Sequence, residues 1–199
     1  MGLMVLGIFL FIGAHAFPMM SIQRDRVVAR IGLGPYKAVF SLVSLVGLGL
    51  MIYGKATAPF LPGYTHPAWG QYAALGLMPL AFILIVAAYV PCTIKRWTIH
   101  PMTLGILLWA VAHLLCNGDR ASAILFGSFA IYAAINLFGQ VGRPQPARVP
   151  PQPWTRDGIV VAVGLVTTLV FTGAHHILFG VSALPWLFGP EPALPSLTQ

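Results

Sequence analysis

The chain has 199 residues, of which 58% are hydrophobic and only 8% are charged, and its mean hydropathy is +0.84. Soluble domains carry about 25% charged residues, so this composition indicates an integral membrane protein and excludes an ordinary soluble enzyme. The formal net charge of +7 does not indicate a nucleic-acid-binding protein, because lysine and arginine accumulate in the loops on one face of a membrane protein.

Six stretches are apolar and long enough to span a bilayer, which takes about 20 residues. Prolines, glycines and an Asn-Gly-Asp turn at 117–119 mark their ends. The first stretch lacks a basic leader and a cleavage site, so we expect a retained helix rather than a signal peptide. The predicted spans are residues 2–20, 35–54, 70–90, 100–117, 121–139 and 158–179. The predicted fold class is all-α: a polytopic membrane protein with about six transmembrane helices, in one domain over residues 1–199.

The basic residues alternate between the two sides that six spans would create. The loops after the first, third and fifth spans hold nine of them: Arg24, Arg26, Arg30, Lys37, Lys95, Arg96, Arg143, Arg148 and Arg156. The other side holds Lys55 and Arg120. Because lysine and arginine favour cytoplasmic loops, both termini are predicted on the non-cytoplasmic side. Cys92 and Cys116 then fall near opposite faces, which argues against a disulfide between them.

Histidine supplies the titratable chemistry expected inside the spans, where an ionisable residue is costly and suggests function. His15 shares one helix face with Met4, Ile8 and Phe11. Gly13 beside it would let another helix or a flat ligand approach closely. An interhelical hydrogen bond is the alternative role for His15.

His113 is the last residue of an apolar and aromatic stripe along one face of the predicted helix, and Trp109 lies on that face one turn earlier. This pattern suits a buried planar cofactor, and it equally suits ordinary packing with one hydrogen-bonded histidine. His100 lies about 140° around the helix from His113 and about 20 Å along it, so the two cannot hold one cofactor together. We expect His100 to be an interfacial or capping residue.

The last predicted span ends in FTGAH, which repeats FIGAH of the first span at four of five positions. Gly164, Phe171 and His175 share a face there, which favours His175 over His176 as the inward-facing residue. His66 lies in the loop GYTHPAW and is expected to be a solvated turn residue.

Four motifs occur together in this chain: GxH in the first span, IGLGPYKAVFSLVSLVGLGLMIYG in the second, AAYVP in the third, and HPMTLGILLWAVAHLLCNGDRASAILFGSF across the fourth and fifth. Their combination resembles the NnrU family of bacterial membrane proteins over most of the chain. The resemblance implies a location in the bacterial inner (cytoplasmic) membrane. It also implies a role in denitrification, in nitrite and nitric oxide metabolism.

That family is similar to 15-cis-zeta-carotene isomerase, a membrane enzyme that binds haem b through two axial histidines. Matched motif by motif, the axial histidines correspond to His15 and His113, and His100 corresponds to a position that is not a ligand. The resemblance therefore implies haem b held by His15 and His113. Phe11 and Trp109 would wall its pocket. It further implies a redox or haem-dependent isomerase role and a hydrophobic or nitrogen-oxide-related substrate.

Depth in the membrane suggests a reserve ligand. At 1.5 Å per residue, His15 lies about 10 Å and His113 about 20 Å from the cytoplasmic face. His175 lies closer to the depth of His113, so the pair His113 and His175 is the second choice. The sequence identifies no catalytic residue.

Two other functions compete with haem chemistry. A non-enzymatic assembly factor with membrane partner proteins, or a small transporter supporting nitrite or nitric oxide reduction, is favoured by the absence of Asp and Glu from the spans. A resemblance to isoprenylcysteine-type methyltransferases rests on IHPMTLG, which lacks the Arg and Tyr of that family's segment, and it ranks third.

Overall fold

The computed structural model of the chain describes residues 1–98, 100–140 and 150–184. Most of these residues are helical, and the only β-pairing among them is an isolated bridge between Pro62 and Asp119. The predicted all-α class is therefore confirmed for the described residues. Two basic residues of the predicted charge pattern, Arg143 and Arg148, and the proline-rich tail from residue 185 lie outside them.

Each predicted span corresponds to one long helix, with ends that differ by a few residues. The long helices are α1 (Gly2–Ala16), α3 (Leu33–Ala56), α4 (Gly70–Tyr89), α6 (Pro101–Cys116), α7 (Arg120–Gln140) and α8 (Trp154–Phe179). Three short helices join them at one end of the bundle: η1 (Phe17–Met19), α2 (Ser21–Ile31) and α5 (Thr93–Trp97). The Asn-Gly-Asp turn separates α6 from α7, as predicted.

Five helices among the described residues are long and apolar enough to cross a membrane: α1 continued by η1, then α3, α4, α7 and α8. The helix α6 is also apolar but has only 16 residues. At 1.5 Å per residue it measures about 24 Å, short of the roughly 30 Å hydrocarbon core. It packs between α4 and α7 inside the bundle. The structure thus shows a helical membrane protein with five candidate spans.

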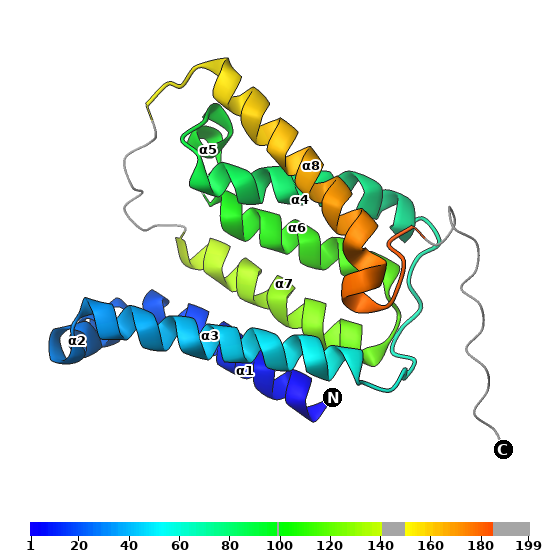
Figure 1. The fold of residues 1–199 in the computed structure, drawn as a ribbon, viewed down its shortest axis with the longest axis horizontal. Helices are drawn as coiled ribbons and strands as arrows, with labels where there is room; N and C mark the ends of the chain where they lie inside the picture. The colour runs from blue at the N-terminus through cyan, green and yellow to red at the C-terminus, as the bar shows by residue number, and fades with distance from the viewer. Residues whose placement is uncertain (99, 141–149, 185–199) are drawn as a thin grey trace.

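The long helices alternate in direction along the chain (Figure 1). The N-terminus, the loop at 57–69 and the end of α8 lie at one end of the bundle, and α2 and α5 lie at the other. We call these the N-terminal end and the α5 end. Basic residues of the described chain divide between them as the sequence pattern predicts, with Lys55 and Arg120 on elements that meet at the N-terminal end.

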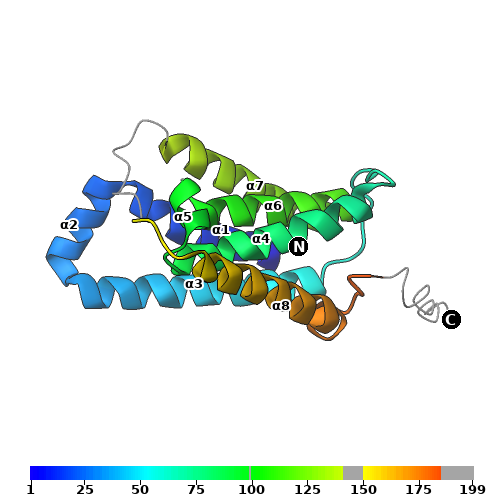
Figure 2. The same cartoon turned by 90° about the horizontal axis from the view of Figure 1, so that it is seen from above.

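In space the helices pack in the order α3, α1, α7, α6, α4, α8. Seen from above, α7 lies on one side of the bundle, and α3 and α8 lie on the other (Figure 2). Glycine allows close approaches: a Cβ atom at Gly54 would lie 2.7 Å from the Cα of Met4. Small residues of this kind let backbones of membrane helices pack against each other.

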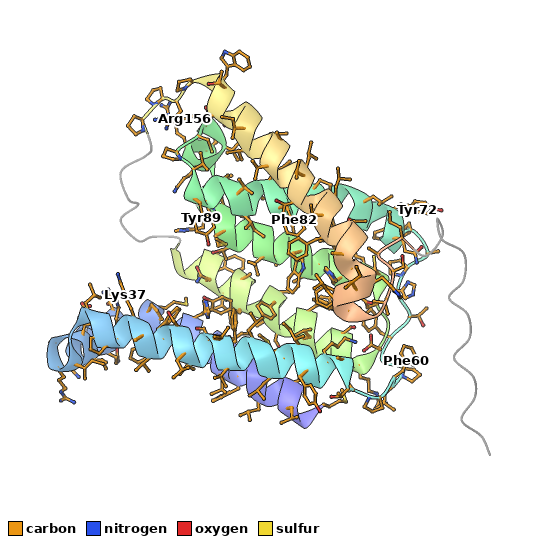
Figure 3. All side chains as sticks on the ribbon, in the orientation of Figure 1. Lys37, Phe60, Tyr72, Phe82, Tyr89 and Arg156 are labelled. Atoms are coloured by element: carbon orange, nitrogen blue, oxygen red, sulfur yellow. The ribbon has the colours of Figure 1, made fainter. Side chains whose placement is uncertain are left out.

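Large apolar side chains cover the outside of the bundle (Figure 3). Ile131, Leu45 and Leu169 are among those more than half exposed. A water-soluble monomer rarely exposes apolar surface so continuously, so the surface fits a lipid bilayer. The two cysteines are free, as predicted: Cys92 lies between α4 and α5, and Cys116 ends α6.

Candidate histidine site

His113 lies in the last turn of α6 with its imidazole held between backbone and aromatic rings. Its Nδ1 is 2.8 Å from the carbonyl oxygen of Trp109. Because a carbonyl oxygen only accepts, Nδ1 carries the proton and Nε2 keeps its lone pair. The imidazole also stacks on Phe126 of α7, with ring centroids 4.3 Å apart and planes at 22°. His113 is thus fixed in the tautomer whose Nε2 can bind a metal or accept a proton.

His175 brings a second imidazole to His113 from α8. The two ring centroids are 6.5 Å apart and their planes are inclined by 22°. His175 donates from Nδ1 to the carbonyl oxygen of Val181 over 2.8 Å, so its Nε2 also keeps a lone pair. On the same face of α8, Gly164 is buried against Ile83 of α4, and Phe171 stacks on Phe82 of α4 with centroids 5.3 Å apart (Figure 3 labels Phe82). His176, on the neighbouring face, is exposed.

His15 occupies a separate place near the end of α1. Its Nδ1 donates to the carbonyl oxygen of Phe11 over 2.8 Å, and its ring stacks on Phe11 with centroids 4.2 Å apart. The His15 ring also contacts the ring of Phe40 in α3, with centroids 5.1 Å apart. The interhelical hydrogen bond at this residue comes from the Tyr132 hydroxyl to the main-chain oxygen of His15, 3.2 Å away. The imidazole itself is therefore not used for that bond.

The close helix approach expected at Gly13 occurs elsewhere on α1. A Cβ atom at Gly13 would meet nothing within 4 Å, whereas one at Gly7 would lie 2.6 Å from the carbonyl oxygen of Gly47 in α3. The expectation for Gly13 as a helix contact is therefore wrong. The reason is that α3 packs on the face of α1 that carries Gly7, two turns before the histidine.

A row of aromatic rings separates His15 from His113. Phe129 of α7 contacts Phe11 and Trp109, with centroids 5.7 and 5.4 Å apart. Phe11 and Trp109 therefore lie near one level of the bundle. Since α1 and α6 run in opposite directions, each histidine lies about 6 Å beyond that level, on opposite sides. The structure thus separates His15 and His113 by roughly 12 Å along the bundle, while it places His175 next to His113.

Of two other histidines, His66 differs from its expected role, and His100 lacks only the capping bond that was one of its two expected roles. His100 occupies the N-cap position of α6, but its side chain makes no capping hydrogen bond and its Nε2 is buried without a partner among the described residues. His66 is half-buried rather than solvated, because its ring lies beside Gly118, and its Nδ1 has no partner there either. Among the described residues, the ring contacts and side-chain hydrogen bond of His113 involve other partners than these two histidines.

The Asn-Gly-Asp turn holds the helix end that carries His113. The Asn117 amide donates from Nδ2 to the main-chain oxygen of His113 over 2.8 Å. The Asp119 carboxylate accepts from the main-chain N of Ser122 over 2.9 Å and from Lys55 Nζ over 3.1 Å. Burial opposes ionisation of Asp119, but these hydrogen bonds and the Lys55 charge outweigh it, so the pKa of Asp119 lies below its ordinary value.

The donor set discriminates between kinds of metal centre. Within the described part of the chain, no group of three or more His, Cys, Asp or Glu side chains could hold a metal ion. Structural or catalytic zinc needs three or four protein ligands. A haem iron needs only one or two, because the macrocycle supplies the others. Two imidazoles on one metal place their centroids about 6 Å apart, given metal–nitrogen distances of about 2 Å. The His113–His175 separation fits this arrangement.

Sequence reasoning missed the rings that α7 contributes to this site. Phe126 and Phe129 lie three residues apart on one face of α7 and contact His113 and Trp109 respectively. Their spacing in ILFGSF was the available signal. It could not show that α7 packs between α1 and α6.

Comparison with known proteins gives one finding. The sequence model of the family described as NnrU protein matches residues 3–183. Apart from the first residue of α1, this range contains the long helices, and with them His15, His113 and His175. No curated protein and no solved structure matches the chain.

Proposed function

The chain belongs to the NnrU family, and from this premise we propose that it binds haem b in the bacterial inner membrane. In this proposal the protein serves a redox or isomerase-like reaction of nitrogen-oxide metabolism. The α6 helix crosses with the other five as a short span inside the bundle. Both termini lie on the non-cytoplasmic side. The support for this topology is the alternation of helix direction, with the described basic residues of the loops concentrated at the α5 end.

The observation that carries the proposal is the pair of imidazoles of His113 and His175, 6.5 Å apart. Each donates from Nδ1 to a carbonyl oxygen and keeps Nε2 available, as metal-binding histidines commonly do. In this proposal His113 and His175 would hold the haem iron, ahead of the pair His15 and His113 that the family resemblance implies. When bound, the haem would supply a redox-active iron in a planar apolar group.

The other side chains of the site orient and shield the two histidines. The carbonyl oxygens of Trp109 and Val181 accept the Nδ1 protons and so orient each ring with its Nε2 available. Phe126 and Trp109 cover His113 with apolar rings and exclude water from it. Asn117 fixes the main chain of the same turn. These residues set the ligand geometry and the dielectric around the iron, which tune its potential.

An optical spectrum tests the proposal. Protein produced with ample haem should show a Soret band in the oxidised and reduced states, and His113→Ala should remove it. His176→Ala is the matched control, because it removes an exposed imidazole from the neighbouring face of α8. Wild-type protein that stays colourless would contradict haem binding and favour the assembly-factor or transporter function.

A further inference from the structure

An apolar cavity of about 500 Å³ lies at the α5 end of the bundle. It lies between the segment that leaves α5, the first half of α6 and the second half of α7. Its walls are formed by Trp97, Thr98, Leu104, Leu107, Ala134, Leu137 and Phe138. Thr98 is the only polar residue among them, and its hydroxyl already donates to the carbonyl oxygen of Ile94 over 2.7 Å. The cavity therefore offers its occupant almost entirely apolar contacts.

This cavity is separate from the histidine site. Leu104 and His113 are nine residues apart on α6, which places them about 180° apart around the helix. The cavity therefore opens on the face of α6 opposite to the one that carries His113. Binding in it does not depend on haem.

The cavity opens toward the outside of the bundle, where the bilayer lies. Trp97 and Phe138 at its rim are 79% and 77% exposed. Tryptophan with this exposure at a helix end is typical of the membrane interface. Its volume lies within the range of about 300–1,000 Å³ typical of ligand pockets. An occupant that enters from the bilayer and makes apolar contacts is a lipid chain.

A basic residue, Arg96, directly precedes the rim residue Trp97 in the chain. Arg96 is exposed, and its side chain forms no hydrogen bond or ion pair with the described residues. Its neighbour Lys95 is already used, since Nζ donates to the carbonyl oxygen of Ala88 over 2.6 Å. Basic residues on the cytoplasmic side of membrane helices attract anionic lipid headgroups. Arg96 is thus the available partner for a phosphate at the mouth of the cavity.

We propose that this cavity binds an acyl chain of an anionic phospholipid from the cytoplasmic leaflet, with the lipid phosphate held by Arg96. The apolar lining selects the chain, and the guanidinium selects the charged headgroup. A bound lipid would fill the space between α6 and α7 near the α5 end.

Native mass spectrometry of the full chain tests this, after reconstitution with equal amounts of phosphatidylglycerol and phosphatidylcholine. The wild type should retain phosphatidylglycerol preferentially. Ala134→Phe fills the cavity and should remove the retained lipid. Arg96→Gln should lower the preference for phosphatidylglycerol about fivefold, because one basic residue near the surface contributes about 1 kcal/mol. Arg26→Gln, an exposed arginine on α2 at the same end, is the matched control and should retain the preference.

Two results would overturn the proposal: equal lipid retention by the wild type and Ala134→Phe, or equal loss of preference in Arg26→Gln and Arg96→Gln. Circular dichroism of each variant reports whether it folds. Should Ala134→Phe fail to fold, Phe138→Ala carries the same comparison, because it removes a largely exposed wall and should also lower lipid retention. A normal Soret band in a variant that loses the lipid would show that the two sites are independent.

Discussion

Lys55 and Asp119 form an ion pair of 3.1 Å that joins the end of α3 to the start of α7. The Asp119 side chain is 10% exposed and that of Lys55 is 35% exposed. The same carboxylate oxygen caps α7 through the main-chain N of Ser122. One residue of the Asn-Gly-Asp turn therefore ties together two helices that are distant in the sequence.

Asp119→Ala should lower the free energy of unfolding by about 2 kcal/mol, because it removes both the cap and the partner of Lys55. Asp119→Asn should cost less than about 1 kcal/mol, since Asn also caps helices and only the charge is lost. Thermal unfolding in detergent, followed by circular dichroism, measures both. The control is Asp25→Asn, which breaks the exposed Arg24–Asp25 pair and should change nothing measurable. Equal effects of Asp119→Ala and Asp25→Asn would refute a structural role for the turn.

The same carboxylate predicts a pH dependence of stability. The pKa of Asp119 lies below its ordinary value of 3.8, so the folded state favours the ionised form. Its contribution is complete above the ordinary pKa and is lost as the pH falls through the lower folded pKa. When the pH is lowered past about 4, the unfolding temperature of the wild type should therefore decrease, and that of Asp119→Asn should decrease less. Identical slopes in the two proteins would assign the acid sensitivity to other groups.

Close packing of α1 on α3 gives a prediction with an internal control. A Cβ atom at Gly54 would overlap the main-chain N of Met4 and lie 2.7 Å from its Cα, so Gly54→Ala must push the two backbones apart. We expect it to cost about 1–3 kcal/mol in unfolding free energy. Gly49→Ala lies on the same helix with nothing within 4 Å of the added atom. It should be neutral or slightly stabilising, as expected for alanine in a helix. Equal destabilisation by both would contradict the packing.

The sequence predicts the long helices well because length and apolar composition are local properties. Residues 70–90 and 121–139 differ from α4 and α7 by one or two residues at their ends. The short helices were not predicted, because they are neither long nor apolar. The α2 helix has the sequence SIQRDRVVARI, whose charges are typical of a loop between spans. The α2 helix packs against α3 and η1, and contacts of this kind cannot be read from the local sequence.

Only part of the candidate site could be predicted, because helix faces are local properties and the packing order of helices is not. Periodicity identified the inward faces that carry His113 and His175, because a face depends only on spacing along one helix. Which faces meet depends on the packing order, and in it α7 separates α1 from α6. The sequence therefore could not show that Phe129 lies between Phe11 and Trp109. At 1.5 Å per residue, His175 was expected near the depth of His113, and the two rings do lie close together, with centroids 6.5 Å apart.

The choice of second axial ligand can be decided by carbon monoxide binding. With His113 and His175 as ligands, His175→Ala should retain haem through His113 and leave one axial position open. Reduced His175→Ala should then bind carbon monoxide with a shifted Soret band, whereas reduced His15→Ala should respond as the wild type does. The physical reason is the ring geometry: 6.5 Å separates His113 from His175, and Phe11, Phe129 and Trp109 lie between His113 and His15.

The opposite pattern, with carbon monoxide binding in His15→Ala and not in His175→Ala, would restore the pair that the family resemblance implies. It would require Phe129 and Trp109 to leave the space between the two helices when haem binds. His176→Ala controls for loss of an imidazole from the end of α8 and should match the wild type, because its side chain is exposed. Unfolding temperatures of the three variants would separate loss of a ligand from loss of the fold.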